Sequence, residues 1–222
     1  MMTTRMKKNA SQTLTSGKIT NLSKDCEEIN IRGAVAVHQE IQLKKISSHG
    51  HSSFYSMVKA DILKNTGACT IKDFCEITEL SNAGQLKLQH GKIAKINSSG
   101  KLTVAQNLHV KQFDGIGVVK AKEIQSEHFY LKLSGRSDIE QLTADEIRIE
   151  KDKLSISLFN NKKMVSKNIK GKNIYLSYTD AATVEGDVVS IGDHCKIHTL
   201  YYTESYFISP KAKVQHIRRK EQ

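Results

Sequence analysis

Histidine and cysteine are the side chains in this sequence best suited to holding a metal ion, and they occur close together at two places. His49 and His51 flank a glycine, and His194, Cys195 and His198 form an HCxxH cluster. A structural zinc site takes four such ligands, and neither cluster supplies a complete set. We therefore expect ordinary corner residues at both places, and no metal ion or other cofactor.

Other chemical motifs give little support for catalysis. The sequence has no GxxxxGK[ST] phosphate loop and no glycine fingerprint between a strand and a helix, so nucleotide use has no support. The four cysteines form no CxxC pair and predict no disulfide framework; they are Cys26, Cys69, Cys75 and Cys195. We expect Cys69 and Cys75 to act as small apolar core residues. The expected protein is not an enzyme and has no small-molecule substrate.

Aromatic residues gather near the end of the sequence, and four of them form a candidate assembly interface: Tyr201, Tyr202, Tyr206 and Phe207. Tyrosine and phenylalanine are enriched at the buried centres of protein interfaces. The same residues could instead fill the core of the last part of the fold. Both interpretations stay open at this point.

Lys and Arg exceed Asp and Glu, which gives a formal net charge of +11. This charge favours an anionic partner, and small basic clusters at the two ends supply candidate contacts: Lys7, Lys8, Arg218, Arg219 and Lys220. A membrane surface or a related scaffold protein would suit them. We expect no nucleic-acid partner, because the basic residues lack a recognition fold or interleaved stacking aromatics.

No apolar run approaches the length of about 18 residues that spans a bilayer, and the first residues lack the apolar middle of a signal peptide. The expected location is the cytoplasm, with a possible peripheral position at the inner face of the membrane.

These residues must be positioned by a repeating fold, because glycines recur at 33, 50, 67, 84, 100, 117 and 135. The spacings are 17, 17, 17, 16, 17 and 18 residues, and such a period is typical of a solenoid. A large apolar residue stands four positions before each glycine: Ile29, Ile46, Leu63, Leu80, Ile96, Phe113 and Leu131. We expect these seven residues to occupy one inward-facing column of stacked coils.

Within each repeat, apolar residues come in pairs two apart, which is the periodicity of a strand. The prediction is an all-β protein, a single-stranded β-solenoid (parallel β-helix) with about 17 residues per coil and three short sides. The glycine would turn a corner that often needs positive φ. Ser48, Asn65, Asn82 and Ser98, two positions before a glycine, could form a hydrogen-bonded ladder. An ordinary antiparallel sandwich is the alternative.

The domain boundaries follow from where this period holds. We expect a disordered basic tail at 1–16, a solenoid at 17–151, an irregular insertion or altered coil at 152–170, a terminal solenoid section at 171–217 and a basic tail at 218–222. Atypical ends are expected because a last coil exposes strand edges and an open core.

A solenoid enzyme is a further alternative, and it would need a concentrated site. The residues eleven positions after the glycines are a mixture of basic, acidic and neutral types and form no acidic column. They are Lys44, Asp61, Thr78, Lys95, Lys111, His128 and Glu146. We interpret them as a solvated face, with a strip that binds an anionic partner as the alternative.

Roughly from residue 17 to residue 217, the sequence resembles the bactofilins, bacterial polymer-forming cytoskeletal proteins, especially the longer type of Gram-positive bacteria. The resemblance rests on the glycine-marked coils and on the segments VEGDVVSIGDHCKIHTLYYTES and ISPKAKV. It implies a right-handed β-helix that joins end to end into nonpolar filaments without nucleotide. The sequence departs from that family in lacking proline-rich tails and in carrying the 152–170 segment.

The expected function is a non-enzymatic scaffold that self-assembles through its ends and supports cell shape, the envelope or motility. The alternative is a monomeric or dimeric peripheral adaptor that binds an anionic membrane or another scaffold through basic faces.

Overall fold

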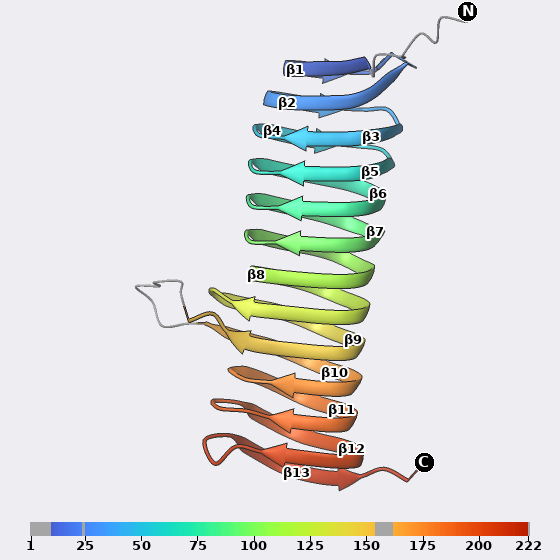
Figure 1. Cartoon of the computed structure of the whole chain (residues 1–222). Helices are drawn as coiled ribbons and strands as arrows, with labels where there is room; N and C mark the ends of the chain where they lie inside the picture. The colour runs from blue at the N-terminus through green and yellow to red at the C-terminus, as the bar shows by residue number, and fades with distance from the viewer. Residues whose placement is uncertain (1–9, 24, 154–161, 222) are drawn as a thin grey trace, which may run out of the picture.

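The computed structural model describes residues 10–23, 25–153 and 162–221. Within these residues the chain forms strands and no helix, and it coils into a parallel β-solenoid of about twelve turns (Figure 1). This confirms the fold class that the 17-residue period predicts. The strands are β1 (Ala10–Ile19), β2 (Cys26–Val37), β3 (Ile41–Ser48), β4 (His51–Phe54), β5 (Val58–Asn65), β6 (Ala68–Asn82), β7 (Gln85–Ser98), β8 (Lys101–Leu133), β9 (Arg136–Lys151), β10 (Lys163–Leu176), β11 (Thr179–Ile191), β12 (Lys196–Ile208) and β13 (Lys213–Arg219).

The strands follow one another along the axis in chain order, so β1 and β13 lie at opposite ends of the stack (Figure 1). Every pairing between the described strands is parallel. Long strands such as β6 bend round more than one side of a coil. Its buried residues come in pairs, which are Cys69 with Ile71, Cys75 with Ile77, and Leu80 with Asn82. Two exposed residues in succession mark each corner.

The predicted inward column is present over its first six residues. Ile29 pairs with Ile46, Ile46 with Leu63, and the register continues through Leu80 and Ile96 to Phe113. All six are at most 2% exposed, which confirms the role assigned to them.

The seventh position differs from the prediction. Phe129, not Leu131, stacks on Phe113, with ring centroids 4.6 Å apart. Leu131 lies instead beside Gly115, where its Cδ1 atom is 3.1 Å from the place a Cβ would take. The column advances by only 16 residues here, and Phe129 stands six positions before Gly135, whereas Phe113 stands four before Gly117.

The repeated glycines are required by close stacking, not by the positive φ that we expected. Among the described glycines only Gly17 has a positive φ, of 110°. A Cβ at Gly50 would lie 2.2 Å from the carbonyl oxygen of Gly33, and one at Gly67 would lie 2.1 Å from that of Gly50. The corner backbones of successive coils thus lie so close together that no side chain fits between them.

The predicted polar ladder forms inside the core. Asn65 Nδ2 donates to Asn82 Oδ1 at 2.8 Å, and Asn82 Nδ2 donates to Ser98 Oγ at 3.0 Å. Ser48 does not continue it, because its hydroxyl instead bonds that of Ser52. Asn65 Oδ1 is consequently left without a hydrogen-bond partner.

A second continuous column, which we call the corner column, crosses every turn of the stack. Its last two residues are Tyr202 and Arg219, which pair between β12 and β13. The column consists of Ala10, Cys26, Leu43, Ala60, Ile77, Ile93, Val110, Ser126, Ala144, Gly171, Gly186, Tyr202 and Arg219.

The boundaries of the solenoid are wider than expected. β1 begins at Ala10, inside the segment we had expected to be a tail, because Leu14 pairs with Ile31 and is buried against it. β10 begins at Lys163, since Met164 and Ile169 face the core while Lys167 pairs with Glu140 on the surface. Arg218 and Arg219 belong to β13 rather than to a tail. Residues 1–9, 24, 154–161 and 222 lie outside the described part of the chain.

Candidate functional site: the C-terminal end of the solenoid

The core continues to the last strand of the stack. In β12, Ile197 and Leu200 are buried, and β13 places Val214 beside Ile197 and Ile217 beside Leu200. Ile217 nevertheless remains 42% exposed. No described strand lies beyond β13, so residues in core columns reach the surface here.

The second half of β12 is exposed for the same reason. Tyr206 pairs with buried Val189, and Ile208 pairs with buried Ile191, so both occupy core columns. β13 pairs with β12 only from Lys196 to Tyr202. Tyr206 is therefore 43% exposed although it stands in the column of Phe129 and Ile147.

The four aromatic residues of the candidate interface divide into two pairs. Tyr202 lies over buried Gly186, packs against the core, and has its ring centroid 4.6 Å from that of Tyr206. Tyr201 and Phe207 alternate with these inward positions and face outward, and Phe207 is 61% exposed. Tyr202 and Tyr206 cover part of the core end, and Tyr201 and Phe207 flank it.

Three of the basic residues expected to contact an anionic partner, Arg218, Arg219 and Lys220, lie on the same end. Lys220 Nζ is 2.8 Å from Glu185 Oε2 and lies over the ring of Tyr201, while Lys170 Nζ is 3.0 Å from Glu185 Oε1. Hydrogen bonds from Lys220 and Lys170 hold the pKa of the Glu185 carboxyl below its ordinary value, although partial burial opposes this shift. Glu185 thus ties the end of the chain to the preceding coils.

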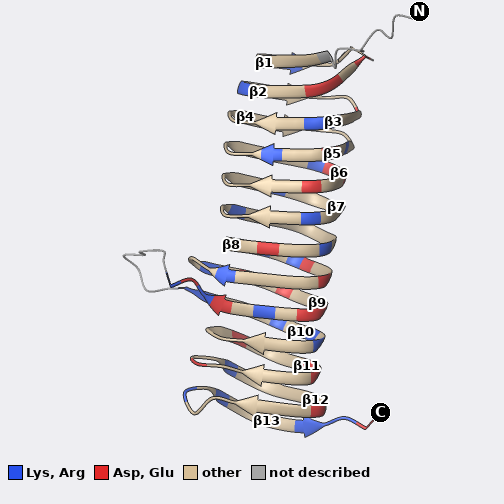
Figure 2. Ribbon diagram, in the orientation of Figure 1, with Lys and Arg blue, Asp and Glu red and all other residues tan. Residues whose placement is uncertain are grey.

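Other basic side chains at this end extend into solvent. Arg218 pairs in register with Tyr201, and Lys213 with Lys196. None of Lys196, Lys213, Arg218 and Arg219 has an ion pair within the described part of the chain. β13 is accordingly a basic edge strand, and its C-terminal end is blue at the bottom of Figure 2. Lys7 and Lys8 lie outside the described residues.

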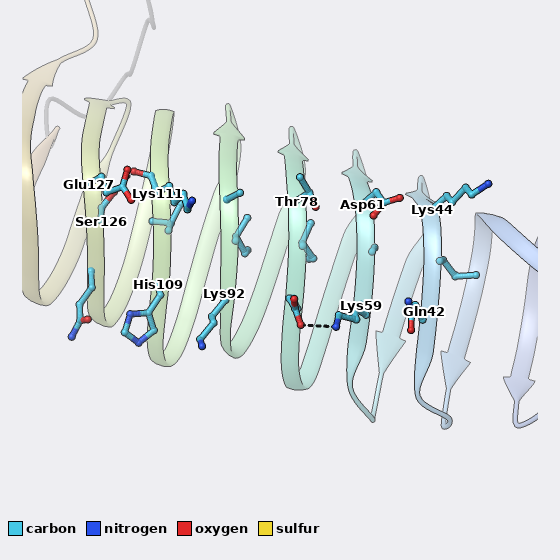
Figure 3. A pocket seen from close by; sticks show the side chains of 18 of the residues that line it. Gln42, Lys44, Lys59, Asp61, Thr78, Lys92, His109, Lys111, Ser126 and Glu127 are labelled. Atoms are coloured by element: carbon cyan, nitrogen blue, oxygen red, sulfur yellow. Dashed lines mark hydrogen bonds and ion pairs between the residues drawn. The ribbon is translucent and has the colours of Figure 1, made fainter.

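A shallow groove of about 1010 Å³ runs along the side of seven successive coils, from β2 to β8 (Figure 3). The corner column forms its floor, and charged residues line both rims. Four lysines and four carboxylates alternate there, with ion pairs between Lys44 and Glu27 and between Lys59 and Glu76. The charges of the lining therefore balance. Lys44, Asp61, Thr78 and Lys111, which stand eleven positions after a glycine, lie in the groove, and the anionic-partner strip stays a prediction.

The histidines of the two candidate clusters contact other side chains. His49 Nδ1 lies 2.9 Å from Thr66 Oγ1, and His198 contacts Gln215 and His216. Cys195 is buried, and its burial raises the thiol pKa to about 11. The described residues contain no group of three or more His, Cys, Asp or Glu arranged to hold a metal ion.

Three residues of the exposed core end were not singled out from the sequence: Ile208, Val214 and Ile217. Their alternation with polar neighbours in SYFIS and KVQHIR could have identified them. No family model, curated protein or solved structure matches this chain. A membrane-spanning helix is absent from the described residues.

Proposed function

We propose that this β-solenoid is a non-enzymatic scaffold of the bactofilin type that self-assembles through its ends. The observation that carries the proposal is the exposure of core-column residues at the C-terminal end, where Tyr206 is 43% and Ile217 is 42% exposed. The proposed setting is the cytoplasm of a bacterium, where a stiff rod would support cell shape, the envelope or motility.

Association at this end would gain two kinds of interaction. β13 and the second half of β12 offer backbone groups that a further strand can pair with. Burying an apolar side chain fully contributes roughly 1.5 to 3 kcal/mol, so covering Tyr206, Ile208, Val214 and Ile217 would be strongly favourable. The partner that fits both features is another solenoid end.

Negative-stain electron microscopy of the full chain, combined with sedimentation, tests the proposal. We expect rods longer than one solenoid. The double substitution Tyr206→Ser with Ile217→Ser should shorten them while the circular dichroism spectrum stays unchanged. Ile116→Ser is the matched control, because Ile116 is 46% exposed on the side of the solenoid. Uniform monomers of the unaltered chain would contradict self-assembly.

The basic edge favours one second candidate, an adaptor that binds an anionic membrane surface. Lys196 and Lys213 pair in register, Arg218 lies on the same strand as Lys213, and all three lack ion pairs among the described residues. A basic residue near an anionic membrane contributes about 1 kcal/mol. Binding to phosphatidylserine vesicles that disappears at high salt and after Lys213→Gln with Arg218→Gln would support this candidate, and equal binding to neutral vesicles would reject it.

A further inference from the structure

The described solenoid contains a whole number of turns. Its first strand begins at Ala10 and its last strand ends at Arg219, and both residues stand in the corner column. The chain therefore leaves the stack at the same angular position at which it enters. If the solenoid ended part of the way round a turn, the exposed sides of its two ends would lie at different angular positions around the axis.

Because the chain enters and leaves the stack at the same angular position, the two ends are complementary. When a second copy is moved along the axis by these turns without rotation, Gln12 to Ile19 of its β1 continue the columns that end in β12 and β13. Ala10 and Arg219 fall on the same place in the corner column, so one of these two strand ends must leave the stack at the joint. Leu14 falls in the column of Ile208, and Ile19 falls in the column of Val214. Apolar residues thus meet apolar residues in both columns, and the parallel strand pairing of the interior continues across the joint.

We infer that the copies join head to tail, with the C-terminal end of one solenoid covered by β1 of the next. This inference rests on the proposed self-assembly and specifies its geometry. It gives a polar filament, unlike the nonpolar filament that the resemblance to bactofilins implies.

The distribution of charge supports the same arrangement. A joint between two C-terminal ends would bring Lys213, Arg218 and Arg219 of one copy against the same residues of the other. A head-to-tail joint places only Lys18 in the column of Lys213, because β1 carries no other charged residue. Head-to-tail assembly should therefore suffer less repulsion between like charges, and moderate salt should promote it.

Disulfide cross-linking between two single substitutions tests the direction of the joint. Thr13 and Phe207 share one outward-facing column, and both are exposed. Neighbouring strands lie about 4.8 Å apart, which is within the Cα separation of roughly 4.4 to 6.8 Å that a disulfide accepts. In a head-to-tail joint, Cys at 13 of one copy lies next to Cys at 207 of another.

Full-length Thr13→Cys and Phe207→Cys proteins are mixed in equal amounts, oxidised briefly, and analysed by intact mass. We expect the mixed dimer to exceed each homodimer at least tenfold. Asn97→Cys, exposed in the same column but in the middle of the solenoid, replaces Phe207→Cys in the control and should cross-link at the background level.

The outcomes separate the joint geometry from the proposed function. Homodimers in place of mixed dimers would overturn the head-to-tail joint and leave self-assembly standing. Filaments in the microscope without cross-links above the Asn97→Cys background would do the same. Monomers in the microscope, with no cross-links, would overturn both.

Discussion

The glycine stack predicts a large effect for a single methyl group at the centre of the solenoid. In Gly67→Ala, the new Cβ would lie 2.1 Å from the carbonyl oxygen of Gly50, whereas ordinary contact begins at 3.4 Å. The backbone conformation itself suits alanine, because φ at this position is not positive. The whole cost therefore comes from separating two coils by about 1 Å.

That separation breaks the hydrogen bonds on both sides of the corner. Ala68 N donates to Gly50 O at 2.9 Å, and Thr66 N donates to Ser48 O at 2.9 Å. Stretching both by about 1 Å takes them beyond hydrogen-bond distance, at about 1 to 2 kcal/mol each. Replacing glycine by alanine offsets up to about 1 kcal/mol by restricting the unfolded chain. The expected net loss is about 1 to 4 kcal/mol.

Urea unfolding followed by circular dichroism measures this loss, and hydrogen exchange at the amides of Thr66 and Ala68 reports the local opening. Gly135→Ala is the control, because its Cβ would meet only a side-chain atom, Val118 Cγ2, at 3.0 Å. It should change stability by less than about 0.5 kcal/mol. If Gly67→Ala is equally mild, close stacking is not the reason for the glycines.

Three further predictions concern the core and the C-terminal end. Ser48→Ala should lower the free energy of unfolding by about 1 kcal/mol, because it removes the buried hydrogen bond between the hydroxyls of Ser48 and Ser52; Ser47→Ala on the outer face is the control for urea unfolding. Burial raises the thiol pKa of Cys69 to about 11 and of Cys75 to about 12, so both thiols should react with a disulfide reagent at pH 8 only as the core opens. The stability gained by keeping these thiols neutral is complete below pH 9 and is lost as pH rises towards 11 and 12, and an alkaline unfolding curve that stays flat across this window would contradict it. The lowered pKa of Glu185 contributes stability above its ordinary value of 4.5, which is lost as pH falls through the folded-state pKa; amide exchange in β13 should then accelerate in the native protein, and Glu185→Gln should remove that dependence on pH.

The column residues could be predicted from the sequence because the period of 17 aligns them without knowledge of the fold. Ile96 and Phe113 are one such pair. Phe129 could not be assigned in the same way, since the column advances by 16 residues here while the glycines advance by 18. The role of the glycines was equally hidden, because positive φ and close backbone stacking both select glycine and leave the same sequence pattern.

The strand in the lysine-rich segment was not predicted from the sequence, for a different reason. Lys163 to Lys170 reads as a basic loop, yet Lys167 pairs with Glu140 and Lys170 with Glu185 in neighbouring coils. Those carboxylates are distant in sequence, so the neutralisation of the lysine charges by ion pairs can be recognised only once the coils are stacked. The aromatic cluster was visible from composition, whereas its division between core-facing and outward-facing residues depended on the register with β11.

The residue types at the two ends of one core column argue that these ends are adapted to both exposure and burial. The column runs through isoleucine, leucine and phenylalanine in the interior, but it begins with Gln12 and finishes with Tyr206. Glutamine and tyrosine each carry a polar group that water satisfies, while their carbon atoms can pack on a neighbouring side chain. An aliphatic residue at either place would expose a core column to solvent and favour indiscriminate edge association. Across the proposed head-to-tail joint, Gln12 and Tyr206 would meet in one column, where the tyrosine hydroxyl and the glutamine amide could hydrogen-bond each other; such a pair would favour specific and reversible assembly.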